Sequence, residues 1–310
     1  MTHNLQPLVT VAGPTGAGKS DLAILIAQTF CGEIINCDSL QLFRYFTIGT
    51  AKIPVAERAG IPHHLLDHIN PDVLMTAGEY ARMAREMLKN VTERGKLPII
   101  CGGTGFYLKA LLEGLSPSPG RDEALRERLA RRPEKLHRLL MRLDGEAAGR
   151  IDANDINKLI RALEIRIVGG KPAKEMMAGR QNALGGYRIL KLGLNPARPL
   201  LQERIKQRSQ KMFEEGLLDE VRSILAMGFR ATVKPFEAIG YKESMRVLQG
   251  EISEAEAVRL TEIHTRQYAK RQLTWLRRDP EIQWMEEFGQ TAAAGEKALA
   301  LVEEFLRGPG

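Results

Sequence analysis

The segment from Gly13 to Ser20 constrains the fold of this chain most strongly, because it reads Gly-Pro-Thr-Gly-Ala-Gly-Lys-Ser. Apolar residues 8–12 precede it, and residues 22–27 carry the apolar pattern of a helix. A strand, a glycine-rich turn and a helix in this order are the context that a phosphate-binding loop requires. The glycines let backbone N–H groups converge on phosphate oxygens, and the N-terminus of the helix adds partial positive charge. The segment therefore predicts a site for a diphosphate or a triphosphate.

Side chains of this segment, here called the phosphate loop, supply charge and a metal ligand. Lys19 is placed to neutralise phosphate oxygens, and the Ser20 hydroxyl is placed to bind Mg²⁺. In a helix predicted at 199–216, Arg204 and Arg208 lie four residues apart, a spacing that suits a clamp on a diphosphate and is equally common among surface charges. The predicted diphosphate-binding residues are Gly13, Pro14, Thr15, Gly16, Ala17, Gly18, Lys19, Ser20 and Arg208.

Two further apolar runs predict strands that end in polar residues. Residues 33–37 lead into Asp38, and residues 97–101 lead into Gly-Gly-Thr-Gly with Thr104. Ligands of open parallel sheets lie outside the carboxyl ends of the strands, so Asp38 and Thr104 are expected in the crevice that Lys19 faces. A capping role for Asp38 and a tight turn for the glycines are the structural alternatives. Many phosphate-loop nucleotidases place a Mg²⁺-binding aspartate where this chain has Cys101.

The order of the predicted elements gives an α/β fold, with a phosphate-loop parallel sheet flanked by helices. The Ser-Pro-Ser-Pro-Gly segment at 116–120 marks a boundary, and the helical patterns beyond it predict an inserted all-helical lobe at 119–183. Residues 1–118 and 184–310 form the core domain in this interpretation. Further strands are predicted at 187–194 and 282–285, and helices at 76–94, 237–248, 259–278 and 292–306.

The composition of the chain bears on its cellular compartment and on the class of molecule that it binds. The 310 residues carry a net charge of +7, and basic residues concentrate at 121–142 and 259–278. With Tyr268 and Trp275 interleaved, these stretches favour RNA, although a solvated helix face explains an isolated run. The three cysteines lack paired spacing, and we expect Cys37 and Cys101, which end apolar runs, to be buried thiols. His64 and His68 lack a third metal ligand, so we expect them to be hydrogen-bonded. No targeting or membrane-spanning pattern is present, which predicts a cytoplasmic protein.

A set of short motifs occurs in order along nearly the whole chain. They are residues 13–20, 38–41, 48–52, 102–105, 161–164, 240–243 and 265–272. Each motif alone is weak, whereas the ordered set is specific. Together they resemble bacterial tRNA dimethylallyltransferases, also called tRNA isopentenyltransferases. The resemblance implies transfer of a dimethylallyl group from its diphosphate to N6 of the adenosine on the 3′ side of the anticodon.

This resemblance also implies roles for particular residues. Lys19 and Mg²⁺ at Ser20 would stabilise the leaving diphosphate, Asp38 would act as the general base, and Thr104 would position the amine or a diphosphate oxygen. The target base would be flipped from its stack into a pocket. A monomer is expected, with the lobe holding the anticodon stem-loop. The residues expected to contact tRNA are Asp38, Ser39, Leu40, Gln41, Thr104, Arg126, Asn157, Lys158, Leu159, Ile160 and Arg161.

Two departures and two rival functions remain at this point. The loop has Gly-Ala-Gly-Lys-Ser where the family often has Ala-Ser-Gly-Lys-Thr, and Asn157-Lys158 stands where Gln-Arg is common. Ser20 in place of threonine keeps the hydroxyl, whereas Lys158 in place of arginine loses a planar guanidinium. A small-molecule kinase using ATP is the main rival, and a non-catalytic RNA-binding NTPase or chaperone is the second. The basic lobe and the glycines after Cys101 argue against a kinase, and Asp38 and Thr104 argue against a pure binder.

Overall fold

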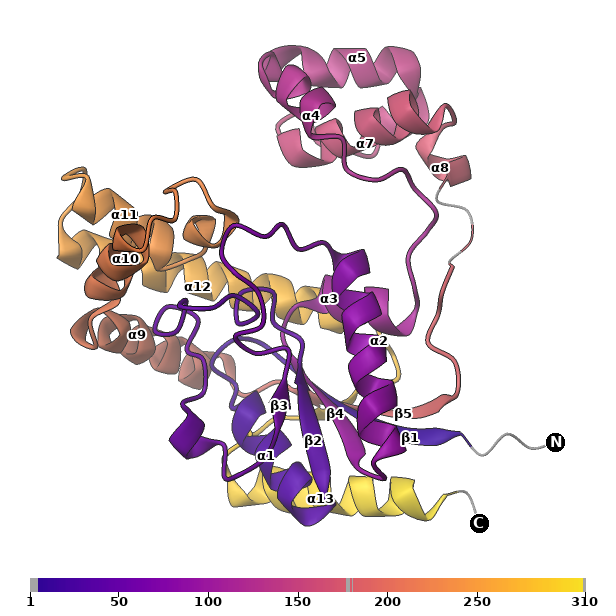
Figure 1. The fold of residues 1–310 in the computed structure, drawn as a ribbon, viewed down its shortest axis with the longest axis vertical. Coiled ribbons are helices and arrows are strands. Elements are labelled where there is room, and N and C mark those ends of the chain that lie inside the picture. The colour runs from indigo at the N-terminus through magenta and orange to yellow at the C-terminus, as the bar shows by residue number, and fades with distance from the viewer. Residues whose placement is uncertain (1–4, 177–178, 180, 309–310) are drawn as a thin grey trace. The chain divides into compact units, whose positions relative to one another are not determined.

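A computed structural model describes residues 5–176, 179 and 181–308 of the chain. Its sheet consists of parallel strands in the order β3-β2-β4-β1-β5-β6. The strands are β1 (Gln6–Ala12), β2 (Gly32–Asn36), β3 (His63–His64), β4 (Leu97–Gly102), β5 (Tyr187–Leu194) and β6 (Gln283–Met285). Because β1 pairs with both β4 and β5, the phosphate loop leaves the middle of the sheet (Figure 1).

Helices cover both faces of this sheet, which explains why β1 and β4 are apolar and buried along most of their length. On one face, α1 (Lys19–Thr29) and α13 (Ala292–Arg307) pack with Val9, Val11 and Ile99 in one core cluster. On the other face lies α2 (Ala77–Glu93), which packs against β2 and β4 (Figure 1). Thr76 and Glu79 form a capping box at the start of α2, within the helix predicted at 76–94.

A group of helices near the C-terminus builds a second core cluster. α9 (Arg198–Glu214) packs against α12 (Glu254–Leu276), and α11 (Tyr241–Leu248) packs against α12 and α10 (Leu217–Ala226). The short 3₁₀ helix η3 (Lys234–Glu237) adjoins α11. Phe43 and Phe46, from the loop after β2, enter this cluster beside the fully buried Tyr241. The long loop between β2 and β3 is therefore anchored to helices far away in sequence; it contains the 3₁₀ helix η1 (Val55–Glu57).

The chain divides into two compact units, which we call the core unit (residues 1–111 and 185–310) and the lobe (residues 112–184). The sequence analysis places the lobe at 119–183. Within the lobe, the pairing of Leu115 with Gln181 joins the incoming and outgoing segments. The helical elements assigned to it are α4 (Glu123–Ala130), η2 (Pro133–Lys135), α5 (Leu136–Leu143), α6 (Gly145–Ala148), α7 (Ile156–Gly169) and α8 (Ala173–Met176).

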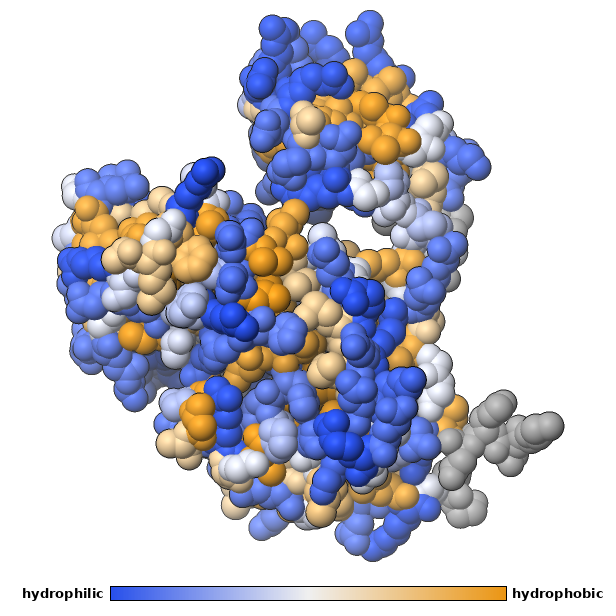
Figure 2. Space-filling model, viewed as in Figure 1, coloured by the Kyte–Doolittle hydropathy of each residue, from blue (hydrophilic) through white to orange (hydrophobic). Residues whose placement is uncertain are grey.

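The lobe has an apolar core of its own, formed by α4, α5 and α7 around Leu140, Leu159 and Leu163. α3 (Gly105–Leu112) follows β4 and ends where the lobe begins. Hydrophilic residues cover most of the visible face of each unit (Figure 2). None of the described helices combines the length and apolar character that crossing a membrane requires.

The predicted α/β fold with a parallel sheet is confirmed, and so are the strands after the phosphate loop and the helices near the C-terminus. Cys37 and Cys101 are buried free thiols, as expected. The strand β3 and the helix α10 are elements that the sequence analysis does not contain. β3 has only two residues, too few to show an alternating pattern, and its position follows from its pairing with Ile34 and Ile35.

Candidate active site

The phosphate loop curves over the end of β1 in a conformation that its glycines permit. Gly16 and Gly18 have φ values of +83° and +84°, which a side chain would disfavour, and Gly18 caps the N-terminus of α1. The ammonium of Lys19 donates to the Pro14 carbonyl at 2.8 Å and so lies across the loop. Burial lowers the pKa of Lys19, while the charge of Asp38 opposes this shift. A cation held in this way is well suited to an incoming anion.

Arg208 reaches the same region from α9. Its guanidinium donates to the carbonyl of Thr50 at 3.4 Å. Burial lowers the pKa of Arg208 to about 10, against the charge of Asp38, which raises it. The neighbouring Arg204 stacks over the ring of Phe288, with its guanidinium carbon 5.0 Å from the ring centroid. Arg208 therefore lines the same cavity as Lys19 and Asp38, and its role as a clamp on a diphosphate stays a prediction.

Asp38 is held at the end of β2 by hydrogen bonds of the backbone around it. Its Oδ1 accepts from the N–H of Leu40 at 2.9 Å and of Gln41 at 3.4 Å. Thr104 lies beside it, because its hydroxyl oxygen accepts from the N–H of Ser39 at 3.0 Å and its own N–H donates to the Cys37 carbonyl. Thr104 therefore bonds to both neighbours of Asp38, and the turn after β2 orients the carboxylate. Asp38 lines the cavity at this end of the sheet, whereas Thr104 is not among the residues that line it.

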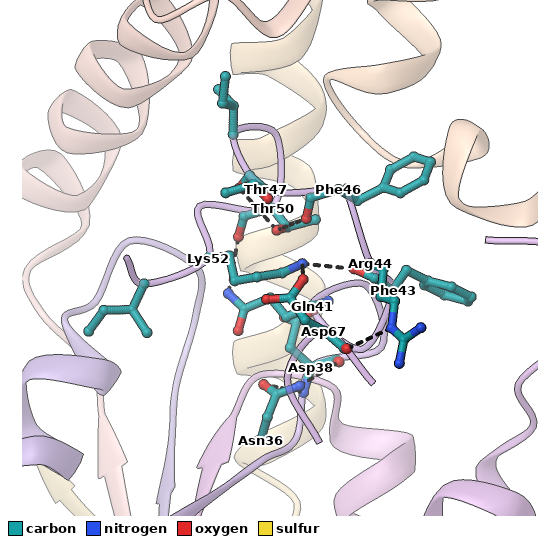
Figure 3. A network of polar contacts seen from close by, with 12 residues as sticks. Asn36, Asp38, Gln41, Phe43, Arg44, Phe46, Thr47, Thr50, Lys52 and Asp67 are labelled. Atoms are coloured by element: carbon teal, nitrogen blue, oxygen red, sulfur yellow. Dashed lines mark hydrogen bonds and ion pairs between the residues drawn. The ribbon is translucent and has the colours of Figure 1, made fainter. Parts of the chain in front are cut away.

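Figure 3 shows how the loop that follows Asp38 is fixed. Lys52 is 5% exposed, and its ammonium donates to the Phe43 carbonyl at 2.7 Å and to the Asp67 carboxylate at 2.6 Å. Burial lowers the pKa of Lys52, and Asp67 opposes the shift. The amide of Gln41 donates to the carbonyl of Thr50 at 3.1 Å. Lys52 therefore braces the loop internally and does not extend toward the phosphate loop.

Two adjoining cavities of the core unit meet at these residues. The phosphate-loop cavity, of about 480 Å³, is lined by Lys19, Ser20 and much of the phosphate loop. The second cavity, of about 440 Å³, has apolar walls that include Leu40, Phe43, Met75, Ile205 and Met212. Residues that line both are Thr15, Asp38, Thr50, Arg208 and Met212. Two different ligands can therefore approach Asp38 from separate cavities.

The region near Ser20 offers few protein ligands for a metal ion. Ser20 and Asp21 both line the phosphate-loop cavity. In the part of the chain that the structure describes, no group of three histidine, cysteine or carboxylate side chains is placed to hold a metal. A Mg²⁺ ion here fits only if ligand phosphates supply most of its oxygens, which is usual for this ion. The expected hydrogen bonding is found for His64, which bonds the Glu33 carboxylate at 2.6 Å, and for His63, which bonds the Ile61 carbonyl, whereas His68 is exposed.

In the lobe, the residues expected to contact tRNA differ in exposure. Asn157 and Lys158 are exposed, whereas Leu159 and Ile160 are buried in the lobe core. Arg126 and Arg161 both bond the buried carboxylate of Glu164, which also accepts from the N–H of Asp122 at 2.7 Å. Burial raises the pKa of Glu164, but the bonds from the two arginines outweigh this effect and lower it to about 2.

Several residues that hold the site are not singled out in the sequence analysis. Tyr241 OH donates to Glu220 at 2.5 Å and accepts from the N–H of Gly49, while Glu220 also accepts from the N–H of Ile48. Gln272 bonds Thr15 of the phosphate loop at 2.8 Å. Tyr241 and Gln272 belong to the motifs at 240–243 and 265–272, and the motifs were the only signal in the sequence for them.

A parallel sheet with a glycine-rich loop, two partly buried cations and a carboxylate where two cavities adjoin is an arrangement typical of enzymes that bind phosphorylated substrates. Comparisons identify which one. The family model described as IPP transferase matches residues 41–279. The chain is 54% identical over 304 residues to a tRNA dimethylallyltransferase of Solibacter usitatus, covering 97% of this chain and 99% of that protein. It is 46% identical over 301 residues to one of Koribacter versatilis, covering 96% and 98%. The chain therefore belongs to the tRNA dimethylallyltransferase (IPP transferase) family.

Solved structures agree with this assignment. The tRNA isopentenylpyrophosphate transferase of Bacillus halodurans has a TM-score of 0.71 and 33% identity, and the match covers 98% of this chain and 96% of that one. A eukaryotic dimethylallyltransferase, described as acting on tRNA, has a TM-score of 0.82 and 26% identity over 98% of this chain and 80% of that one. The resemblance stated from the motifs is confirmed, and the family supports a prenyltransferase over the kinase.

Proposed function

We propose that this chain transfers a dimethylallyl group from dimethylallyl diphosphate to N6 of the adenosine on the 3′ side of the anticodon in tRNA. The products are N6-isopentenyladenosine and diphosphate. The observation that carries the proposal is the junction of the two cavities at Asp38, flanked by Lys19 and Arg208. A site with cations on one side and apolar walls on the other suits a prenyl diphosphate meeting a nucleobase.

The diphosphate of the donor would lie in the phosphate-loop cavity. Lys19 and Arg208 would bind its oxygens there, together with N–H groups of the loop. Both cations are already desolvated, as their lowered pKa values indicate, so their attraction for charge on the leaving group is little screened. With Ser20 and the phosphate oxygens as ligands, Mg²⁺ would supply additional neutralisation of that charge.

The adenine would enter the second cavity, whose walls of Leu40, Phe43 and Met212 suit a base that has left its stack. The N6 lone pair forms a bond to C1 of the dimethylallyl group while the C1–O bond breaks, and diphosphate leaves with that electron pair. Asp38 accepts the N6 proton as general base. Thr104, which is bonded to Ser39 next to Asp38, would position the amine. Because an exocyclic amine is a weak nucleophile, positioning has to supply much of the rate.

For tRNA itself, we propose that the basic lobe holds the anticodon stem-loop, with contacts from Asn157, Lys158 and Arg161 as well as from Ser39, Leu40 and Gln41 in the core unit. The exposed side chains of Asn157 and Lys158 support this for the lobe. Leu159 and Ile160 would act through the backbone or by shaping α7, because their side chains are in the lobe core.

The proposal is tested by incubating the protein with Mg²⁺, an unmodified tRNA that has adenosine at this position, and either dimethylallyl diphosphate or ATP. Mass spectrometry of the digested tRNA then reads the product. We expect one nucleoside to gain the mass of a dimethylallyl group only with the prenyl donor. A tRNA with guanosine at this position is the matched control and should stay unmodified. ATP turnover without a change in tRNA mass would contradict the proposal and favour a kinase or an NTPase.

A further inference from the structure

Gln272, near the C-terminal end of α12, joins two loops of the site that are distant in sequence. Its Oε1 accepts from the backbone N–H of Thr15 in the phosphate loop at 2.8 Å, and its Nε2 donates to the carbonyl of Gly103 at 2.9 Å. The residue is 6% exposed; its hydrogen bond to Gly103 is buried, and its hydrogen bond from Thr15 is partly buried beside the phosphate-loop cavity. An amide is the side-chain group that offers an acceptor and a donor at one end without a charge. Gln272 therefore links the phosphate loop with the turn after β4.

The glycines of that turn fit this helix closely. A Cβ atom at Gly103 would lie 2.2 Å from Nε2 of Gln272, and one at Gly105 would lie 2.1 Å from the ring of Trp275. Gln272 and Trp275 are three residues apart and so share one face of α12. The Gly-Gly-Thr-Gly turn thus lacks side chains where α12 packs against it. The contact is independent evidence that the link is part of the fold of the site.

From Gly103 the connection continues to the carboxylate. The next residue, Thr104, donates its N–H to the Cys37 carbonyl at 3.2 Å and accepts at its hydroxyl from Ser39 at 3.0 Å. Cys37 and Ser39 are the neighbours of Asp38. Hydrogen bonds therefore run from the phosphate loop through Gln272 to the residues on both sides of Asp38.

We propose that Gln272 is a positioning residue, which sets the distance between the phosphate loop and the turn whose Thr104 bonds to both neighbours of Asp38. The inference rests on the proposed function, in which the donor binds at the first loop and the amine is held at the second. It also commits the N–H of Thr15 to Gln272, just as the N–H of Ala17 is committed to the Pro14 carbonyl, so that neither is directed at phosphate. The sequence interpretation of residues 259–278 as an RNA-binding stripe gives Gln272 no such role.

The test compares Gln272→Met, which keeps the length of the side chain and removes both hydrogen bonds, with Gln272→Glu, which keeps only an acceptor. Prenylation of tRNA should lose roughly 10- to 100-fold in kcat with Gln272→Met, because misplaced reactants react slowly. KM for tRNA should stay within about threefold. Gln272→Glu should also lose kcat, because its carboxylate oxygen faces the Gly103 carbonyl. Lys191, on β5, forms ion pairs with Asp279 and Glu281. The control variant Lys191→Met breaks these pairs and should lower only the melting temperature.

Hydrogen–deuterium exchange provides a readout that does not depend on the reaction. In Gln272→Met, peptides containing residues 13–18 and 102–105 should both exchange faster, whereas in Lys191→Met they should not. Unchanged exchange in both loops would overturn the link even if the protein prenylates tRNA. Faster exchange in a protein that shows no prenylation would instead overturn the proposed function and keep the link. An increase in KM for tRNA with kcat unchanged would assign Gln272 to RNA binding and also overturn the inference.

Discussion

The basic residues at the site of the core unit and those on the surface of the lobe lie in different environments. In the core unit, Lys19, Lys52 and Arg208 are largely desolvated, and burial lowers the pKa of each. In the lobe, Arg128, Arg131 and Arg138 are exposed, and within the described residues none of them forms an ion pair. Buried cations are costly and suit one compact anion. Exposed cations suit an extended polyanion whose counterions they displace.

Within the lobe there is an exception that sharpens this contrast. Glu164 is fully buried and forms ion pairs with Arg126 and Arg161. Two basic side chains of the lobe are therefore bound within the lobe itself. In both units, then, a basic side chain is held by a carboxylate inside the fold, as Lys52 of the core unit is held by the partly exposed Asp67. Position in the sequence and charge alone therefore do not separate the arginines that hold the fold from those that are free to meet a partner.

The largest expected effect concerns the carboxylate at the cavity junction. Asp38→Asn keeps an oxygen that can accept from Leu40 and Gln41 but removes the proton acceptor. We expect kcat for tRNA prenylation to fall by ~10³-fold, and the dissociation constant of tRNA to change by no more than a few-fold. Single-turnover rates and filter binding measure the two quantities, with the exposed Asp72→Asn as a control. Loss of tRNA binding in parallel with activity would remove the general-base role.

An intermediate effect is expected in the lobe, on stability. Glu164→Gln leaves Arg126 and Arg161 without their shared counter-charge, which should cost about 3 kcal/mol. The pKa of Glu164 is lowered from 4.5 to about 2, so its contribution is present above about pH 4.5 and disappears as the pH falls through about 2. The difference between the variant and the wild type should therefore be large near pH 7 and smaller near pH 3.

Hydrogen–deuterium exchange of peptides from α4 and α7 measures this difference within the full chain, with time scales corrected for pH. Lys158→Gln is a suitable control, because it breaks the exposed pair with Asp155 on the same helix α7 and should have little effect. A difference that does not depend on pH would show that the charge of Glu164 is not what stabilises the lobe.

Sequence and structure agree best where a local pattern decides the outcome. The glycines of the phosphate loop and the capping box of α2 act within a few residues, and the apolar runs of β1 and β4 report burial directly. Asp38 and Thr104 are also located by local rules, since each follows a strand of a parallel sheet. The link through Gln272 depends instead on how α12 packs against the turn at Gly103, 169 residues earlier. Charge patterns indicated RNA contact for that helix and gave no information about which side chains face inward.

The smallest expected effect is on the exposed arginines of the lobe, and it tests the other side of the contrast. If Arg128 and Arg138 contact phosphates of tRNA, each Gln substitution should weaken binding several-fold at low salt. Each should also reduce the slope of log affinity against log salt concentration by up to about 1. At saturating tRNA, kcat should not change, because neither arginine has a role in the proposed transfer step. Arg222→Gln, an exposed arginine of the core unit paired with Asp219, is the matched control. An unchanged slope in both lobe variants would mean that an exposed basic side chain in the lobe does not necessarily contact tRNA. Contacts with tRNA should then be sought at Arg126 and Arg161, which are paired with Glu164.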